Sequence, residues 1–336
     1  MSALSVLCPY CLKHGEVKLT NVYQCQNCST VIPRGYVERT HVPRATVGVV
    51  GFSGHGKTVF LTSLFSTIGR LSRFWPSFYY RSLDDYTHKI VYEKVPLFEQ
   101  GILPDSTPAN FPNPALLQYH NVPHYGECFL NYYDTAGEVF TESAQIMRAG
   151  FFVAHADVIW FIMSLTDAGA RPDEEMSRLL DVYIAAVSDR FGVNLRERQR
   201  IVVVLSKADA MQKLLPDTLK NRLLDGGIGR YARDVQDRVI EASLFSLEIE
   251  DWVRNELGAG RFANMARDNF CSVDYCLVSS LGFNTAGKKS YEPLKILDPF
   301  LLVMFYLCRS NPQQKGGKRG LGKFWERIRR LKRLMF

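Results

Sequence analysis

Eight consecutive residues have types and spacing that could bind the phosphates of a nucleotide. They read G-x-x-x-x-G-K-T and are Gly51, Phe52, Ser53, Gly54, His55, Gly56, Lys57 and Thr58. In such a loop the glycines allow backbone N–H groups to turn toward a phosphate, and the helix that follows presents its positive end to the same anion. Lys57 would reach the β- and γ-phosphates, and Thr58 would offer its hydroxyl to Mg²⁺.

The flanks of this loop distinguish a phosphate site from an ordinary glycine turn into a helix. Residues 45–50 form a short apolar run rich in valine, which predicts a buried strand, and residues 58–65 have the apolar spacing of a helix. Strand, glycine loop and helix is the order that the motif requires. We therefore favour a phosphate-binding loop over a simple turn.

A second candidate group follows the strand expected over 126–133 and reads Asp134-Thr135-Ala136-Gly137-Glu138. A carboxylate at the carboxyl end of a core strand is well placed to act on Mg²⁺, usually through water. Gly137 leaves a backbone N–H free to meet a γ-phosphate. The pattern D-x-x-G is common by itself, but its place downstream of a phosphate loop predicts a second phosphate-contacting segment.

The tetrapeptide Ser206-Lys207-Ala208-Asp209 could select the base of a nucleotide. An aspartate can accept two parallel N–H bonds from guanine, whereas adenine offers no such pair, and a lysine stem can cover the ring. Lysine and aspartate are frequent in ordinary loops, which is the alternative interpretation. The buried strand expected over 201–205 runs directly into this segment, and open α/β sheets bind ligands at such strand ends.

Four cysteines near the start of the chain predict a metal site. They form two C-x-x-C pairs separated by thirteen residues and are Cys8, Cys11, Cys25 and Cys28. This spacing is typical of a tetrahedral zinc site with four thiolates, and the metal would replace the core that about forty residues cannot build. Two disulfides are the alternative. The few basic residues of this segment form no phosphate track, so protein contact is favoured over nucleic acid.

The order of apolar segments after Thr46 predicts an α/β domain with a mostly parallel sheet and flanking helices. Strands are expected over 45–50, 115–121, 126–133, 157–163, 201–205 and 276–282, the last leading into a small-residue turn. Helices are expected from 58 onward, in the second half of the aromatic-rich segment 73–100, and over 139–150, 173–191, 230–257 and 299–308. A surface loop is expected over 103–114, because this segment is rich in proline.

The charge of the chain is concentrated in its last residues. The net charge is +7, and residues 315–336 contain nine Lys or Arg against Glu326, so the remainder is almost neutral. Apolar residues recur in this tail at intervals of three and four, which predicts a basic amphipathic helix for an anionic membrane surface or a partner groove. A helix packed on its own domain is the alternative.

No segment has the pattern of a signal peptide or a membrane span, so a cytoplasmic protein is expected, with peripheral attachment at the inner membrane as a further expectation. The expected domains are a zinc ribbon over 1–40, a phosphate-loop domain over 41–310 and the tail over 311–336. Hydrophobic residues make up 46% of the whole chain, which is enough to build a large core.

The segments GFSGHGKT, DTAGE, SKAD and VSSLG, together with Thr107, resemble in order the five conserved boxes of the Ras-like GTPases of the TRAFAC class. The resemblance covers residues 45–308. With a zinc ribbon in front, the chain also looks like the prokaryotic group called double-GTPases, predicted to act in multi-component conflict or signalling systems.

The resemblance implies bound GTP or GDP, Mg²⁺ and Zn²⁺. It places Thr58, Thr107 and Asp134 at Mg²⁺, Gly137 in a second switch, and the guanine base against Lys207 and Asp209. The base would also be backed by the main chain of Ser279, Ser280 and Leu281. Three departures stand out: Ser206 replaces Asn or Thr and would weaken the internal bracing of the loop, Glu138 replaces a water-orienting glutamine, and Thr107 lies far from Lys57 along the chain.

These features predict an Mg²⁺-dependent GTP-hydrolysing switch that is slow by itself and stimulated by a protein partner, such as a second GTPase or an effector. The expected catalytic residues are Lys57, Thr107, Gly137 and Glu138. A scaffold that holds GTP without hydrolysing it is the main alternative, distinguished by Glu138. An ATPase is the second alternative, distinguished by Asp209.

Overall fold

The computed structural model describes residues 4–19, 21–167, 171–211, 213–232, 234–282 and 291–310. The basic tail expected over 311–336 lies outside these residues. Among the described helices, none is both long and apolar enough to cross a bilayer.

A seven-stranded sheet forms the centre of the molecule, with the order β10-β9-β8-β4-β7-β6-β5. From β10 to β7 all neighbours are parallel, whereas β6 is antiparallel to both β7 and β5. This arrangement confirms the predicted mostly parallel α/β fold. The strands are β4 (Arg44–Val50), β5 (Tyr79–Ser82), β6 (Ala115–Val122), β7 (Gly126–Asp134), β8 (Val158–Ser164), β9 (Arg200–Ser206) and β10 (Ser272–Leu277).

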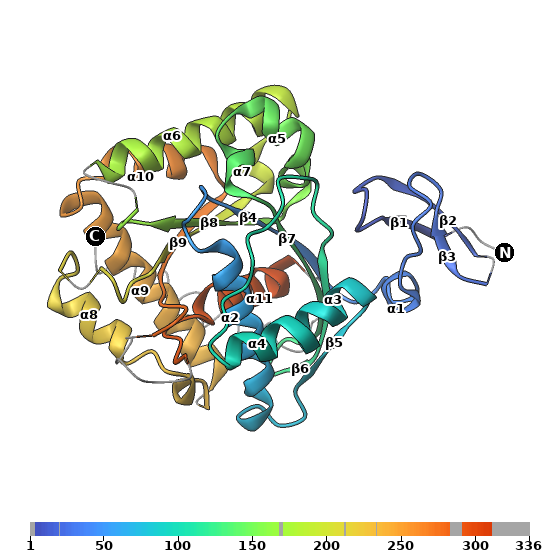
Figure 1. Ribbon diagram of the computed structural model, residues 1–336, viewed down its shortest axis with the longest axis horizontal. Helices are drawn as coiled ribbons and strands as arrows, with labels where there is room; N and C mark the ends of the chain where they lie inside the picture. Colours follow the sequence, from blue (N-terminus) through green and yellow to red (C-terminus); the bar gives the residue numbers. More distant parts are fainter. Residues whose placement is uncertain are drawn as a thin grey trace.

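Helices cover both faces of the sheet, as Figure 1 shows, because successive residues of a buried strand point to opposite sides. Trp160 of β8 packs on Phe60 on one face, and the next residue, Phe161, packs on Phe262 on the other. The helices are α2 (Lys57–Gly69), α3 (Asp85–Lys89), α4 (Val95–Glu99), α5 (Ser143–Ala149), α6 (Pro172–Ile184), α7 (Leu195–Arg198), α8 (Asp217–Leu224), α9 (Val235–Asn255), α10 (Gly260–Asn269) and α11 (Asp298–Ser310).

The aromatic-rich segment forms the helix predicted for its second half, but it also contains two features that were not predicted. A π-helical segment, Ile90–Lys94, joins α3 to α4, and the preceding residues form the edge strand β5. Val91, Val95 and Phe98 of this segment are buried, while Tyr86 is exposed.

The last strand lies earlier than predicted. It covers Ser272–Leu277 instead of 276–282, because its first half is a polar, half-buried edge without the continuous apolar signal of a central strand. Ser279 is outside the strand and makes an isolated antiparallel bridge with Leu294. The helices α8 and α10 were also missed.

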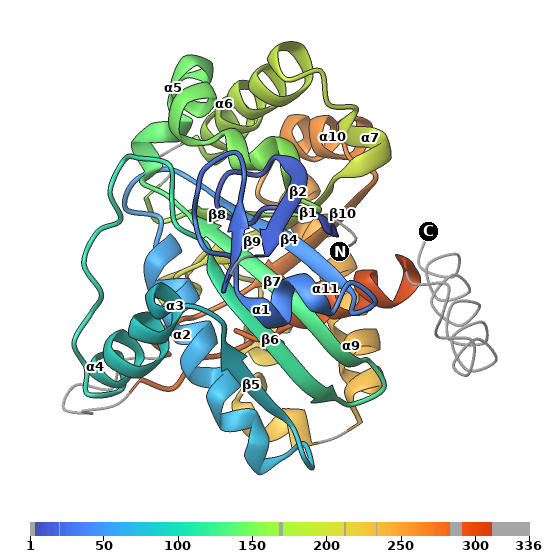
Figure 2. The ribbon, with the colours of Figure 1, turned by 90° about the vertical axis from the view of Figure 1, so that its right-hand side faces the viewer.

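The cysteine-rich segment forms a small antiparallel sheet of β1 (Leu4–Leu7), β2 (His14–Leu19) and β3 (Tyr23–Cys25), followed by α1 (Arg34–Glu38). Figure 2 shows this unit in front of β4 and β7. Tyr36 and Val37 of α1 share a buried cluster with Phe129 of β7. The unit is therefore packed on the central sheet.

Candidate functional site

The G-x-x-x-x-G-K-T segment forms a loop between β4 and α2. Gly56, with φ +85°, directly precedes α2, and this left-handed conformation favours glycine. The Lys57 ammonium donates hydrogen bonds to the carbonyls of Gly51 (2.9 Å) and Phe52 (3.0 Å). Burial lowers the pKa of Lys57, while the charges of Asp134 and Glu138 oppose this shift. A buried cation therefore lies on the loop expected to hold phosphates.

Three oxygen-bearing side chains expected at Mg²⁺ converge beside this loop. The Thr58 hydroxyl lies 2.7 Å from that of Thr107, and both donate to Oδ2 of Asp134, at 3.0 and 2.9 Å. Neighbouring ligands of an octahedral Mg²⁺ at about 2.1 Å are about 3 Å apart, so these spacings fit the ion.

The carboxylate of Asp134 supports the same assignment. Burial raises its pKa, against the lowering effects of Lys57 and the two threonine hydroxyls. Its Oδ1 atom is buried and has no hydrogen-bond partner among the described residues. An unsatisfied carboxylate oxygen at this depth is costly, and a cation with its water ligands would satisfy it.

The aromatic insertion brings Thr107 to Thr58, although the two are 49 residues apart. Its strand β5 pairs with β6, and its helix α4 is fastened to α2 by a hydrogen bond from Ser66 to Glu99 (2.7 Å). The chain then returns past the phosphate loop. The insertion thus forms a compact excursion on one side of α2.

The second phosphate-contacting segment touches the phosphate loop directly. A Cβ atom added to Gly137 would lie 1.9 Å from the backbone nitrogen of Ser53, so no larger residue fits here. A cavity of about 330 Å³ lies between these segments and the residues before Thr107. Hydrogen bonds from its own backbone N–H and from Ser53 lower the pKa of Glu138, which is therefore a carboxylate at neutral pH.

The expected base-binding residues lie together at the end of β9. Oδ1 of Asp209 accepts a 2.5 Å hydrogen bond from Ser279, whose hydroxyl in turn accepts from the backbone N–H of Gly282 (2.9 Å). Lys207 donates to Asp167 (2.7 Å) and lies close to Gly56. The structure therefore joins the SKAD and VSSLG segments into one site next to the phosphate loop.

The serine that replaces the usual Asn or Thr does not leave the loop unbraced, contrary to expectation. The Ser206 hydroxyl donates to the carbonyl of His55 (2.7 Å) and is buried. His55 accepts at Nδ1 from the Ser164 backbone N–H (3.3 Å), and burial lowers its pKa, so the ring is neutral. These contacts tie the phosphate loop to β8 and β9.

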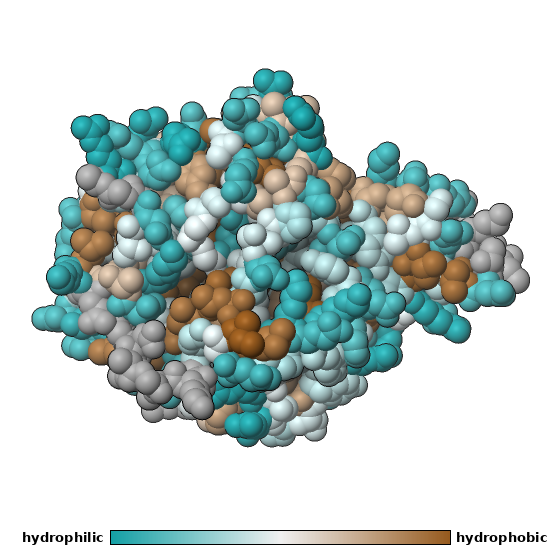
Figure 3. Space-filling view, viewed as in Figure 1, coloured by the Kyte–Doolittle hydropathy of each residue, from teal (hydrophilic) through white to brown (hydrophobic). Residues whose placement is uncertain are grey.

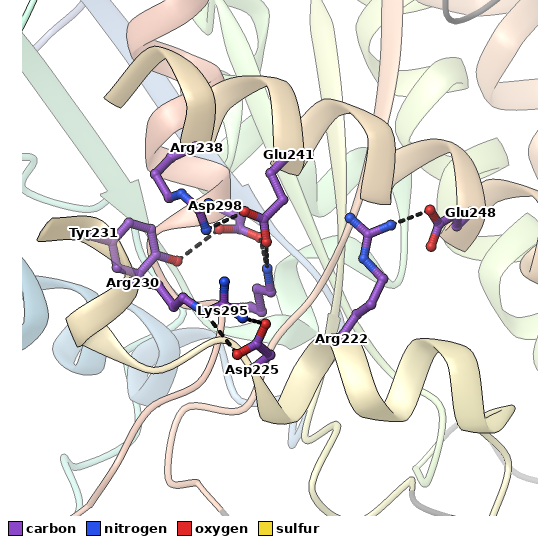
Figure 4. Close-up of polar contacts among 9 residues, drawn as sticks. All are labelled: Arg222, Asp225, Arg230, Tyr231, Arg238, Glu241, Glu248, Lys295 and Asp298. Carbon is purple, nitrogen blue, oxygen red and sulfur yellow. Dashed lines mark hydrogen bonds and ion pairs between the residues drawn. The ribbon is translucent and has the colours of Figure 1, made fainter. Parts of the chain in front are cut away.

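The segment that carries Ser279 to Leu281 is held from two sides. Ser63 of α2 donates to the carbonyl of Ser280 (2.9 Å). Ser279 and Leu294 exchange backbone hydrogen bonds, and the next residue, Lys295, is buried among charged groups. Figure 4 shows Lys295 with Glu241 of α9 and Asp298 at the start of α11. Residues 283–290, between these supports, lie outside the described part of the chain.

Three residues of the site were not singled out from the sequence. Asp167 fixes Lys207, Ser63 supports the base segment, and Thr135 donates to the carbonyl of Asn110 (2.9 Å), joining the DTAGE segment to the loop that carries Thr107. Thr135 lies inside the DTAGE pattern, which could have indicated it. The other two belong to no motif, so only their neighbours in space identify them.

The four cysteines of the ribbon form one cluster. Their sulfurs all lie within 4.8 Å of one another, with Cys8 to Cys28 at 3.8 Å and Cys11 to Cys25 at 3.7 Å. Sulfurs around a tetrahedral Zn²⁺ at about 2.3 Å are about 3.8 Å apart, so the cluster fits this ion. All four are free thiols rather than disulfides. Although burial raises it, backbone N–H groups of Asn27 and Cys28 lower the pKa of Cys25 to about 7, which favours a thiolate.

We expect the purified protein to contain about one zinc ion per chain, because a structural site uses four protein ligands. Replacing Cys25 with Ser should abolish this content, whereas Cys271→Ser, at an exposed thiol outside the cluster, should leave it unchanged. Elemental analysis of protein purified without added zinc measures both. A folded ribbon without metal would contradict the assignment.

Comparison with known proteins agrees with this geometry. A family model described as Double-GTPase 2 matches residues 45–248. This range contains the phosphate loop, Thr107, the DTAGE segment and the SKAD segment, while the cysteine cluster lies outside it. A search of curated proteins found no match.

Among solved structures, the chain is similar to the Roco2 RocCORdC protein of Methanosarcina barkeri bound to GDP. The identity is 14%, the TM-score is 0.28, and the alignment covers 55% of this chain and 40% of the other. This similarity is too distant to support an argument about residues, and the chain spans well under half of that protein. The family match covers more than half of the chain and includes its phosphate loop: the chain belongs to the Double-GTPase 2 family of P-loop GTPases.

Proposed function

We propose that this protein is an Mg²⁺-dependent switch that binds GTP, hydrolyses it slowly, and is stimulated by a protein partner. The observation that carries the proposal is the convergence of Thr58, Thr107 and Asp134 beside a phosphate loop, with Asp209 held at the base end. A binding panel of GTP, GDP and ATP, with and without Mg²⁺, followed by turnover, tests it. Absence of Mg²⁺-dependent GTP binding would contradict it.

The residues divide the chemistry between positioning and charge. Lys57 and the backbone N–H groups of the phosphate loop would neutralise charge that develops on the transferred phosphoryl group. Bound Mg²⁺ would supply further charge neutralisation on the phosphate oxygens. The conformations of the segments that carry Thr107 and Gly137 would depend on the γ-phosphate. Each of these segments lies against the phosphate loop where that phosphate would be bound.

We expect guanine nucleotides to bind at least about tenfold more tightly than adenine nucleotides, because polar groups built for one base stay unpaired with the other. Asp209→Asn should shift preference toward xanthine nucleotides, which present an acceptor where guanine presents its exocyclic amine. The control is Asp217→Asn, at an exposed carboxylate of α8. Titration with fluorescent nucleotides measures this, and equal affinity for GTP and ATP would contradict the base assignment.

Glu138 supports slow intrinsic turnover. As a carboxylate it carries negative charge toward the γ-phosphate and lacks the donor with which an amide orients water. Glu138→Gln should therefore raise single-turnover hydrolysis by at least about tenfold, since one well-placed donor can contribute 10² or more. Glu142→Gln, at an exposed position before α5, is the control. Rapid turnover that Glu138→Gln leaves unchanged would contradict this role.

The same ionised Glu138 favours a second candidate, a scaffold that binds GTP without hydrolysing it. Binding without turnover, even with the partner present, would identify that function. The alternative of an ATPase is less favoured, since an aspartate such as Asp209 can accept two parallel N–H bonds from guanine, whereas adenine offers no such pair.

Exposed apolar side chains near Thr107 and near the DTAGE segment support the proposal of a protein partner. Ile102 and Leu103 lie shortly before Thr107 and are 53% and 50% exposed, and Met147 of α5 is 40% exposed. Figure 3 shows an apolar patch in the middle of the face that carries α2 and α4. A partner bound to these side chains would respond to the conformations of both the Thr107 segment and the DTAGE segment. We propose a second GTPase or an effector in a bacterial signalling or conflict system.

We also propose a cytoplasmic protein whose tail, outside the described residues, attaches reversibly to an anionic membrane surface. Support comes from the sequence, because the tail combines basic residues with an apolar stripe. Nucleic acid would require the charges but not the stripe. Co-sedimentation of the full chain, and of a version ending at Gln314, with anionic and neutral liposomes tests this proposal.

A further inference from the structure

The first cysteine pair of the ribbon lies against the nucleotide site. Leu12, directly after Cys11, is 2% exposed and belongs to the same buried cluster as Val50 and Phe52, at the start of the phosphate loop. Tyr133, the residue before Asp134, is a member of that cluster too. The ribbon residue Leu12 is therefore part of the apolar core that also contains Phe52 of the phosphate loop and Tyr133.

Two hydrogen bonds connect this cysteine pair to the rest of the molecule, one to the residue before Asp134 and one to the aromatic insertion. The Tyr133 hydroxyl donates to the carbonyl of Pro9, which lies between Cys8 and Cys11. The Tyr10 hydroxyl donates to Oδ2 of Asp84 (2.8 Å). Because Tyr133 is adjacent to Asp134, and both bonds end on residues between two metal ligands, the conformation of the metal loop and the position of Tyr133 are linked.

Asp84 extends the contact to the insertion. Its other carboxylate oxygen accepts from the backbone N–H of Thr87 (2.8 Å) and thereby caps the first turn of α3. The Thr87 hydroxyl accepts from the backbone N–H of Leu116 in β6 (2.8 Å). The helix α3 belongs to the insertion that leads to Thr107. Tyr10 is therefore bonded to the cap of the insertion, as Pro9 is to the residue before Asp134.

The ribbon would lose these contacts without its metal. Its own buried cluster is small, and a unit of this size depends on metal ligation to fold. With the metal loop unfolded, Leu12, the Pro9 carbonyl and the Tyr10 hydroxyl would leave the wall of the nucleotide site. Tyr133 would keep its ring contacts with Phe152 and Phe111 but would lose the carbonyl that accepts from its hydroxyl.

We propose that the zinc ribbon is a positioning element for the nucleotide site, so that zinc and guanine nucleotide each strengthen the binding of the other. The proposal rests on the guanine-nucleotide binding proposed above and adds a ligand that regulates it. Pro9, Tyr10 and Leu12 act through Tyr133, Asp84 and the start of the phosphate loop. The coupling is reciprocal, because a factor by which zinc changes nucleotide affinity must equal the factor by which nucleotide changes zinc affinity.

The test measures both affinities on the full chain. Binding of fluorescent GDP with Mg²⁺ is titrated with zinc-loaded and chelator-treated protein, and zinc affinity is measured by chelator competition with and without GDP and Mg²⁺. We expect the two ratios to agree and to lie within about 5–150-fold, the usual range of coupling between two sites. A zinc affinity that nucleotide leaves unchanged would overturn the proposal.

Matched tyrosine variants locate the coupling. Tyr133→Phe and Tyr10→Phe each remove one hydroxyl from the contact and should reduce both ratios, while zinc still binds. Tyr23→Phe is the control, because its hydroxyl bonds Glu38 (2.9 Å) inside the ribbon unit. Equal ratios in all three variants would overturn the assigned contacts. If zinc-loaded protein binds no guanine nucleotide, the proposed function fails and this inference with it; intact binding with no zinc dependence overturns the inference alone.

Discussion

Replacing Lys57 with Met is expected to lower GTP hydrolysis by about 10²–10³-fold, the loss typical of removing one preorganised charge-stabilising donor. The Lys57 side chain is 7% exposed and is held by two carbonyls of the phosphate loop, so the loop itself fixes its position. Methionine has a similar length but neither charge nor donors. Single-turnover hydrolysis at saturating GTP separates this loss from weaker binding.

The control for this variant is Lys213→Met, which removes an exposed lysine outside the site. It should hydrolyse GTP at the rate of the unchanged protein. Thermal unfolding of both variants checks that the sheet remains folded. Turnover of Lys57→Met within a factor of about two would show that the phosphate loop does not supply the expected charge stabilisation.

Replacing Lys295 with Met is expected to lower the free energy of unfolding by about 3–5 kcal/mol, because removing one partner leaves buried charge uncompensated. The Lys295 ammonium lies 3.1 Å from Glu241 and 3.9 Å from Asp298, and its side chain is 5% exposed (Figure 4). Burial raises the pKa of Asp298, against the opposing charge of Lys295. Burial would also raise the pKa of Glu241, but the charge and hydrogen bond of Lys295, together with the charges of Arg238 and Arg230, outweigh it, and the pKa is lowered.

Denaturant unfolding measures this loss. Arg171→Met is the control, because Arg171 forms an ion pair with Glu174 in which the two side chains are 76% and 63% exposed. This substitution should change the free energy of unfolding by about 0.5 kcal/mol or less. Adding Asp298→Asn to Lys295→Met should restore part of the stability, since this removes the carboxylate left without its ion pair, whereas Glu241 keeps its ion pair with Arg238. A single Lys295→Met variant as stable as the unchanged protein would contradict a structural role for these ions.

The Lys295 variant also reports on the base segment. Leu294 bonds the backbone of Ser279, which in turn fixes Asp209. Loss of the Lys295 contacts should therefore weaken guanine binding along with stability, whereas Arg171→Met should affect neither.

The parts of the site whose residues are neighbours along the chain could be predicted from the sequence. A strand, a glycine loop and a helix place Lys57 and Thr58 by local backbone geometry, and the two cysteine pairs follow from their spacing alone. The buried strands were predictable as well, because a strand covered on both faces is apolar throughout. The edge strands β5 and β10 were missed or misplaced, because a half-buried edge carries a weaker pattern.

Contacts between residues that are far apart in the chain could be identified only from the packing of the folded protein. Nothing local to Thr107 places it 2.7 Å from Thr58; the pairing of β5 with β6 and the packing of α4 on α2 do so. The residue type of Ser206 predicted weaker bracing of the loop, whereas in the fold its hydroxyl donates a hydrogen bond to the carbonyl of His55. The contacts of Tyr10 and Leu12 with the nucleotide site, and of Lys295 with Glu241, likewise join elements far apart in the chain. Such contacts depend on how whole elements pack, and residue spacing within one segment contains no information about its neighbours in space.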